Sequence, residues 1–277
     1  MLVGVVGAGT MGSGIAEVFA REGFPVLLTD TSPELADRGL ARIRAGLDRQ
    51  VSRGRVTAEA AAATLAHLAA GRVDDLADRD LVVEAVYESP AAKRAVFGQL
   101  DALCRPGTIF ASNTSSLSVT EMARGLRRPV VGMHFFNPVP VMRLVEVVAG
   151  GDTPPELVQR VMELAARLGK TPVLVNEAPG FVVNRILMPM LNEAVGVLAA
   201  GTASAADIDT AMVLGVNHPM GPLALADLIG LDVCLAILEA MAADTGQDRF
   251  RPHPLLRELV EAGRLGRKSG RGFHDYT

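Results

Sequence analysis

Two residues near the middle of the chain are of the types needed for acid–base chemistry. Glu146 lies between two valines in an apolar run, where a carboxylate is costly unless it is paired and hydrogen-bonded. The surrounding pattern predicts a strand over residues 130–135, a turn interrupted by prolines, and a second strand over residues 143–148. Because the turn returns the chain on itself, we expect His134 to meet Glu146. Such a pair would suit a general base, but a satisfied core histidine and an edge-strand glutamate fit the same pattern.

A glycine-rich segment near the N-terminus predicts dinucleotide binding. It follows the apolar run of residues 2–6, opens a helical pattern, and is followed by Asp30 at the end of a second apolar run. Its glycines would let the backbone approach a pyrophosphate at the positive end of the helix. Asp30 would bond the adenosine ribose and repel a 2′-phosphate, so NAD is favoured over NADP; as a helix cap it would be redundant beside Thr31 and Ser32. The loop consists of Gly7, Ala8, Gly9, Thr10, Met11 and Gly12.

Two consecutive helices are expected over residues 33–53 and 58–69, forming a hairpin inserted into the α/β pattern. Arg42, Arg49 and Arg53 share one face of the first helix, opposite its apolar stripe. An arginine stripe is usually a solvated face. Beside a nucleotide site it could also hold the phosphates of a large anionic substrate.

Polar residues follow the ends of two later strands. Glu88 comes just after a strand expected over residues 80–85, and Lys93 lies near the start of the next helix. The cluster Ser112–Ser116 follows the strand expected at residues 108–112. Ligands of open α/β sheets bind at the carboxyl ends of the strands, so this cluster could supply hydroxyls beside a nicotinamide. It could equally cap a short helix.

Beyond Pro179 and Gly180 the pattern is helical. Helices are expected over about residues 181–200, 204–213, 222–241 and 255–262. The first is apolar nearly all round, as in a core or a subunit interface, and Asn184 in its first turn needs either a ligand or a core partner. The basic, glycine-rich tail around Lys268 could be a loose end or a loop folded back on the cofactor. We therefore expect a Rossmann-type N-terminal domain with an inserted helical hairpin over 1–180, followed by an all-α C-terminal domain over 181–277.

Composition excludes several classes of protein. The chain has 277 residues, 49% hydrophobic, and a net charge of −4, which gives no reason to expect nucleic acid as a partner. Its two cysteines, Cys104 and Cys234, form no disulfide or zinc pattern and fit a reducing cytosol. No secretory signal is recognisable, and the longest apolar stretch contains charged residues, so neither export nor a membrane span is expected. The histidines suggest no metal site, and we expect a cytoplasmic protein.

Seven motifs in this order resemble those of the 3-hydroxyacyl-CoA dehydrogenases, especially the stand-alone bacterial 3-hydroxybutyryl-CoA dehydrogenases. They are Gly7–Gly14 (GAGTMGSG), Ser112–Leu117 (SNTSSL), Gly132–Pro140 (GMHFFNPVP), Leu144–Val148 (LVEVV), Pro179–Arg185 (PGFVVNR), Asn217–Pro222 (NHPMGP) and Gly266–Phe273 (GRKSGRGF). The resemblance covers essentially the whole chain.

The resemblance implies a role for each matching residue. His134 matches the catalytic base and Glu146 its orienting carboxylate, while Ser115 and Asn184 match polar residues at the substrate. Matches to cofactor contacts are Glu88, Lys93, Ser115, Asn137 and Lys268. Arg49 and Arg53 stand where bacterial members carry lysines that hold the coenzyme A phosphates, and Ser115 also matches a substrate contact.

The implied activity is NAD-dependent oxidation of an (S)-3-hydroxyacyl-CoA to the 3-ketoacyl-CoA, or the reverse reduction of acetoacetyl-CoA, by a homodimer. Fatty acid metabolism (beta-oxidation), aromatic degradation, butyrate-type fermentation and polymer metabolism all fit this activity. In this scheme His134 exchanges the proton of the 3-hydroxyl group. The alternative is a hydroxyacid or gulonate-type dehydrogenase that does not need coenzyme A. The arginine stripe separates the two, because a small acid would have no use for it.

Overall fold

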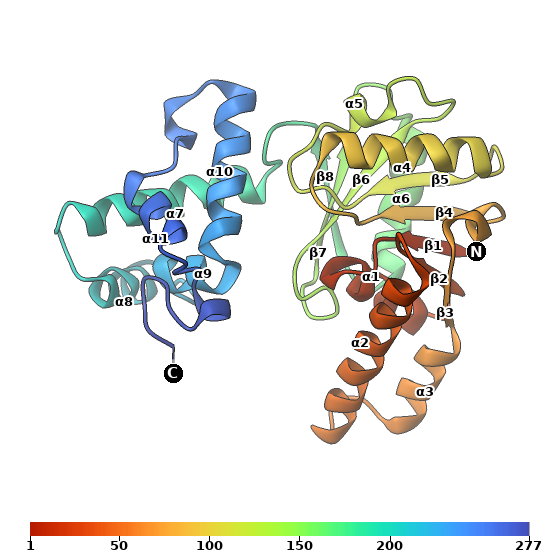
Figure 1. The fold of residues 1–277 in the computed structure, drawn as a ribbon, viewed down its shortest axis with the longest axis horizontal. Coiled ribbons are helices and arrows are strands. Elements are labelled where there is room, and N and C mark those ends of the chain that lie inside the picture. The colour runs from red at the N-terminus through yellow and green to blue at the C-terminus, as the bar shows by residue number, and fades with distance from the viewer. Residues whose placement is uncertain (277) are drawn as a thin grey trace. The chain divides into compact units, whose positions relative to one another are not determined.

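A sheet of eight strands forms the centre of the first of two units into which the chain divides (Figure 1). The computed structural model describes residues 1–276, and the division falls between Glu177 and Ala178. The strands are β1 (Val3–Val6), β2 (Val26–Thr29), β3 (Leu68–Gly71), β4 (Leu81–Glu84), β5 (Ile109–Ser112), β6 (Val130–Phe135), β7 (Leu144–Ala149) and β8 (Thr171–Asn176). The helices of this unit are α1 (Thr10–Arg21), α2 (Pro33–Ser52), α3 (Ala58–Ala66), α4 (Pro90–Leu103), α5 (Val119–Ala123) and α6 (Pro155–Arg167), with a 3₁₀ turn at Val73–Leu76.

The sheet order is β3-β2-β1-β4-β5-β6-β7-β8, and every neighbouring pair runs parallel except β6 with β7. Its first five strands have the order of a Rossmann sheet. Strands β1, β2, β4 and β5 are buried throughout, as expected of parallel strands covered by helices on both faces. The Rossmann-type fold expected from the sequence is confirmed.

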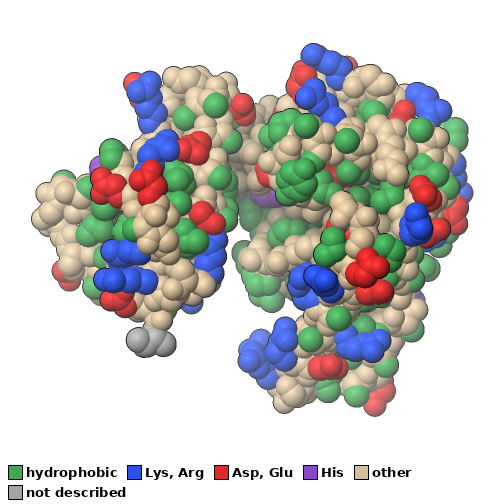
Figure 2. Space-filling model, in the orientation of Figure 1, with side chains coloured by type: hydrophobic (Ala, Val, Ile, Leu, Met, Phe, Trp, Pro, Cys, Tyr) green, Lys and Arg blue, Asp and Glu red, His purple; other side chains and the backbone are tan. Residues whose placement is uncertain are grey.

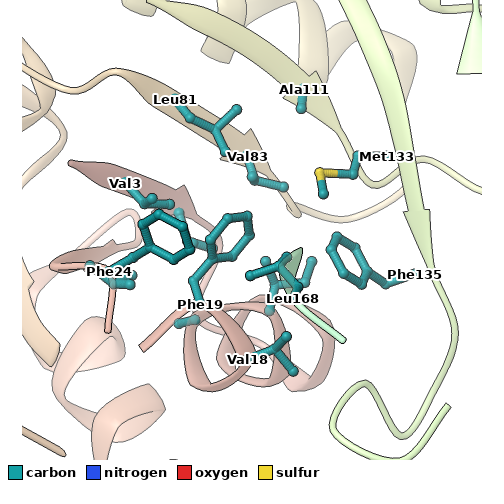
Figure 3. Packing of buried hydrophobic residues seen from close by; sticks show 14 of the residues in the cluster. Val3, Val18, Phe19, Phe24, Leu81, Val83, Ala111, Met133, Phe135 and Leu168 are labelled. Atoms are coloured by element: carbon teal, nitrogen blue, oxygen red, sulfur yellow. The ribbon is translucent and has the colours of Figure 1, made fainter. Parts of the chain in front are cut away.

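One buried hydrophobic cluster of this unit lies between the sheet and helices that include α1 (Figure 3). Phe19 on α1 meets Phe24 edge to face, with ring centroids 5.8 Å apart. Met133 and Phe135 from β6 belong to the same cluster. Because side chains alternate along a strand, the residue between them, His134, points to the opposite face of the sheet.

The hairpin of α2 and α3 occupies the expected place, but its second helix is shorter than expected. The sequence pattern extended that helix to residue 69, whereas α3 ends at Ala66. Leu68–Gly71 instead forms the edge strand β3, whose backbone groups pair with β2 from Val26 to Thr29. This pairing partner is distant in sequence, so local helix propensity could not reveal it.

The second unit is all helical, as expected. It consists of α7 (Val183–Ala199), α8 (Ala205–Val216), α9 (Pro222–Ile229), α10 (Leu231–Thr245) and α11 (Pro254–Glu261), with 3₁₀ turns at Asp248–Phe250 and Arg267–Ser269. The single helix expected over 222–241 is wrong. Gly230, with φ of 106°, separates α9 from α10 in a conformation that side-chain-bearing residues rarely adopt.

Candidate active site

His134 and Glu146 form a buried pair on the two antiparallel strands. They are register partners across β6 and β7, and His134 Nδ1 lies 2.7 Å from Glu146 Oε2. Glu146 is 1% exposed. Because a carboxylate only accepts hydrogen bonds, this contact puts the ring proton on Nδ1 and leaves Nε2 as the nitrogen for proton exchange. The geometry is that of an oriented general base.

The dinucleotide loop has the shape that its glycines require. Gly7 has φ of 103°, and a Cβ there would meet the backbone of Ala85. A Cβ on Gly12 would collide with the carbonyl oxygen of Gly7, whereas one on Gly9 would meet nothing within 4 Å. The loop therefore packs closely against the backbone that follows β4 and against itself, and it stays open at Gly9, directly before α1, where a pyrophosphate would sit.

Asp30 directly follows β2 and holds this loop. The Ala8 N–H donates to Asp30 Oδ2 at 2.7 Å, and the Thr31 N–H donates to Oδ1 at 2.7 Å. The cap of α2 is Ser32, whose side chain accepts from the Leu35 N–H. Asp30 is thus not the helix cap, and its carboxylate stands beside the loop at the edge where an adenosine ribose is expected.

Glu88 accepts hydrogen bonds from the Ser112–Ser116 segment at the carboxyl ends of β4 and β5. Its Oε1 accepts from Thr114 Oγ1 at 2.6 Å and from the Ser115 N–H at 2.9 Å, and Lys93 Nζ lies 3.2 Å from its Oε2. Burial raises the pKa of Glu88, but the Lys93 ammonium and these hydrogen bonds outweigh it and lower the pKa below its ordinary value. The carboxylate is therefore an anion at neutral pH.

Sequence reasoning missed Glu84, the last residue of β4. It is 0% exposed, and its Oε1 lies 2.7 Å from Lys93 Nζ. The signal was available, because an acidic residue ending the apolar run Val82-Val83 is the same anomaly that singled out Glu146.

Hydrogen bonds fix the turn between β6 and β7 at its start and along its length. Asn113 Oδ1 accepts from the Phe135 N–H at 2.9 Å, which links the serine-rich segment to the strand of His134. Lys170, buried before β8, donates to the carbonyl oxygens of Val139 and Met142 at 2.5 and 2.8 Å. Asn137 lies on this turn, followed by a cis peptide bond.

A cleft of about 480 Å³ opens between α1, α2 and this turn. Figure 2 shows basic side chains over the α2–α3 hairpin, at the lower right of the view. Arg49, Arg53 and Arg55 line the cleft, as does Asn137. Arg55 was missed because it follows the helix and does not share its period. Arg42 also lines the cleft, but it donates to the Ala8 carbonyl oxygen at 2.8 Å and so supports the dinucleotide loop.

Asn184 and Lys268 belong to the second unit. Asn184 lies in the first turn of α7 and is buried. Lys268 pairs with Asp232 on α10. The tail is neither loose nor unstructured, because buried Asp227 on α9 accepts from the Phe273 and His274 N–H groups at 2.9 Å each.

Within residues 1–276 no group of three or more histidine, cysteine or acidic side chains could hold a metal ion. No helix among the same residues is both long and apolar enough to cross a membrane.

Comparisons with known proteins point to one family. The models of the 3-hydroxyacyl-CoA dehydrogenase NAD binding domain and C-terminal domain match residues 2–178 and 180–276. The chain is 50% identical over 275 residues to a probable 3-hydroxybutyryl-CoA dehydrogenase of Bacillus subtilis, covering 98% of this chain and 96% of that one. It is also 50% identical over 280 residues to the 3-hydroxybutyryl-CoA dehydrogenase of Clostridioides difficile, covering 100% of both. The crystal structure of (S)-3-hydroxybutyryl-CoA dehydrogenase from Ralstonia eutropha superposes with a TM-score of 0.94 at 46% identity, over 100% of this chain and 99% of that one.

Proposed function

The chain belongs to the 3-hydroxyacyl-CoA dehydrogenase family, and from this we propose that it interconverts (S)-3-hydroxybutyryl-CoA and acetoacetyl-CoA. It is an NAD-dependent oxidoreductase by family. The proposed reaction at the 3-position rests mainly on one observation. This is the buried His134–Glu146 pair, in which Nδ1 and Oε2 lie 2.7 Å apart. The short acyl chain is supported by the names of the full-length relatives.

In the proposed mechanism His134 exchanges the proton and Glu146 stabilises the resulting imidazolium. When bound, NAD supplies or accepts the hydride at carbon 3. His134 Nε2 takes the proton of the 3-hydroxyl group in oxidation and returns it to the developing alkoxide in reduction. Ser115 and Asn184 orient the substrate oxygen.

The residues of the first unit fit NAD. The open position at Gly9 leaves room for a pyrophosphate, and Asp30 presents a carboxylate where a 2′-phosphate would be repelled. We propose Glu88, Asn137 and Lys268 as further residues of the cofactor site, with Lys93 acting there through its ion pair with Glu88.

We propose that the arginine-lined cleft holds the phosphates of coenzyme A. Arg49 and Arg53 supply planar, permanently charged groups suited to phosphate oxygens, and the cleft is large enough to admit a nucleotide. This distinguishes the proposal from a dehydrogenase of small free hydroxyacids, which would not need the cleft.

A steady-state assay tests the proposed function. Acetoacetyl-CoA and free acetoacetate are compared, each with NADH and with NADPH. We expect turnover with acetoacetyl-CoA and NADH and very little with the other three pairs. Equal rates with free acetoacetate would contradict the coenzyme A site and favour the hydroxyacid alternative.

We further propose a homodimer formed through the helical unit. Large apolar side chains on α7 and α8 are exposed there: Ile186 at 67%, Leu214 at 79% and Val216 at 59%. Light scattering should give twice the 29.1 kDa of one chain. The free buried thiols of Cys104 and Cys234 support a reducing compartment, the cytoplasm.

A further inference from the structure

We propose that Glu84 is a positioning residue for the active site. Each of its two carboxylate oxygens begins a chain of hydrogen bonds, and both chains end at the segment that carries Ser115. The inference rests on the proposed function, because that function gives Ser115 its task at the substrate. Neither the sequence motifs nor the matched family residues had singled out Glu84.

Glu84 lies at the edge of the sheet where ligands of such folds bind. It is the last residue of β4 and the register partner of Ser112, the last residue of β5. Complete burial of a carboxylate is costly, and three donors offset the cost here. They are the Val86 N–H at 2.7 Å, Lys93 Nζ at 2.7 Å and Ser112 Oγ at 2.6 Å.

The first chain runs from Glu84 Oε1 through Lys93 and Glu88. The Lys93 side chain is 1% exposed and lies between the two carboxylates, 2.7 Å from Glu84 and 3.2 Å from Glu88. Its ammonium also donates to the Val86 carbonyl oxygen at 3.3 Å. An ammonium has three donors, and these three acceptors use them all. Lys93 therefore acts on the site through Glu88, which holds the Ser115 N–H.

The second chain runs from Glu84 Oε2 through Ser112. The Ser112 hydroxyl donates to Glu84 and accepts from the Thr114 N–H at 3.2 Å. Thr114 Oγ1 in turn accepts from the Leu117 N–H at 2.9 Å. The Ser115 segment is thus held on one side by Glu88 and on the other by Ser112, and Glu84 anchors both.

Replacing Glu84 by glutamine keeps the shape but weakens the first chain and breaks the second. An amide oxygen in the place of Oε1 can still accept from Val86 and Lys93, but the negative charge beside Lys93 is lost, and the NH2 group in the place of Oε2 cannot accept from Ser112. Lys93 then interacts more strongly with Glu88 and competes with Thr114 and Ser115 for that carboxylate. A displacement of roughly 1 Å in a positioned group can cost about 100-fold in rate, so we expect kcat to fall by about 10- to 100-fold.

The test compares Glu84→Gln with Asp101→Asn. Asp101 is also a buried carboxylate, lies on the same helix as Lys93, and binds Arg127 and Arg128 away from the site. We measure kcat, the KM values for acetoacetyl-CoA and NADH, and the thermal midpoint. Both variants should have a lower thermal midpoint than the wild-type protein, but only Glu84→Gln should lower kcat. Equal kcat values in the two variants would overturn the inference.

Two further variants separate the chains. If Glu84 acts through Lys93, Glu84→Gln should cost less in a Lys93→Met background than in the wild-type enzyme, whereas independent effects on kcat would overturn the first chain. Ser112→Ala removes only the second chain of hydrogen bonds and keeps the buried ion pair of Glu84 and Lys93. It therefore tests the inference even if Glu84→Gln does not fold. We expect it to lower kcat severalfold, and an unchanged kcat would overturn the second chain. An inactive wild-type protein would instead contradict the proposed function, whatever the variants do.

Discussion

His134 and Glu146 face each other in register across the antiparallel strands β6 and β7, with Nδ1 2.7 Å from Oε2. Glu146 is itself 1% exposed, so its carboxylate has little water to compete with the histidine. The pair is built into the sheet and does not depend on a loop. This rigidity favours a fixed ring orientation before any substrate binds.

The first prediction concerns this pair. His134→Ala should lower kcat by about 10²–10⁴-fold, the usual contribution of general acid–base assistance. Glu146→Gln keeps the shape but removes the charge that stabilises the imidazolium, so it should lower kcat much more than it raises either KM. Steady-state kinetics give both parameters, and NADH binding followed by fluorescence is the control. Near-normal kcat in His134→Ala would show that another group is the base.

The second prediction concerns the choice of cofactor. Asp30→Ala removes the carboxylate that accepts from the Ala8 N–H. The KM for NADH should rise by about tenfold, since one hydrogen bond to a charged group contributes roughly 1.5 kcal/mol. The ratio of NADH to NADPH efficiency should fall, because the repulsion of a 2′-phosphate is lost. The KM for acetoacetyl-CoA is the control and should stay constant. An unchanged cofactor ratio would show that discrimination lies elsewhere.

The third prediction concerns the two thiols and pH. Burial, with the nearby Asp232 and Asp227 charges, raises the pKa of Cys234 to about 12, and burial also raises the pKa of Cys104. Because the thiolate is the nucleophile, the folded protein should react slowly with a disulfide reagent at pH 8, whereas denatured protein should show two reactive thiols. Fast labelling of the native protein would contradict this.

The same shift has a stability consequence for Cys234. An unfolded thiol loses its proton near about pH 8.5, whereas the folded one keeps it to a much higher pH. The folded state is therefore favoured fully at lower pH, and this contribution is lost as pH rises from about 8.5 towards the folded pKa. The stability difference between the wild-type protein and Cys234→Ala, measured by denaturant unfolding, should shrink between pH 7 and pH 10.

Features encoded locally could be predicted from the sequence. The glycine loop, Asp30 and the His134–Glu146 pair each lie in a short stretch of sequence. The pattern of that stretch predicts both the local structure and its chemical role. Glu146 could be found because it interrupts an apolar run. Glu84 ends another apolar run, but its partners Ser112 and Lys93 come from β5 and α4. No local sequence pattern shows that these two elements meet β4.

Other features depend on contacts between distant segments. The helical period groups Arg42 with Arg49 and Arg53, but only the packing of α2 against α1 shows that Arg42 reaches the Ala8 carbonyl oxygen. The separation of α9 from α10 at Gly230 could not be predicted from the sequence for a related reason. A single glycine is tolerated within a helical pattern, and the tail residue Lys268 occupies the space that a Cβ at Gly230 would need.

The fourth prediction tests the arginine-lined cleft directly. Arg49→Met and Arg53→Met keep most of the apolar stem of the side chain but remove its charged end, so each should raise the KM for acetoacetyl-CoA by about 5- to 20-fold, with little change in kcat. Arg44→Met is the matched control, since Arg44 lies on the same helix but does not line the cleft. Its KM should equal that of the wild-type enzyme.

The decisive comparison uses a thioester that lacks the nucleotide. With acetoacetyl-pantetheine the cleft has no phosphate to hold, so wild-type enzyme, Arg49→Met and Arg53→Met should have the same KM. Because the interaction is between exposed charges, added salt should raise the wild-type KM for acetoacetyl-CoA and have a smaller effect on that of Arg49→Met/Arg53→Met. If the arginine variants weaken both thioesters equally, the arginines support the fold of the hairpin and the phosphates are held by other groups.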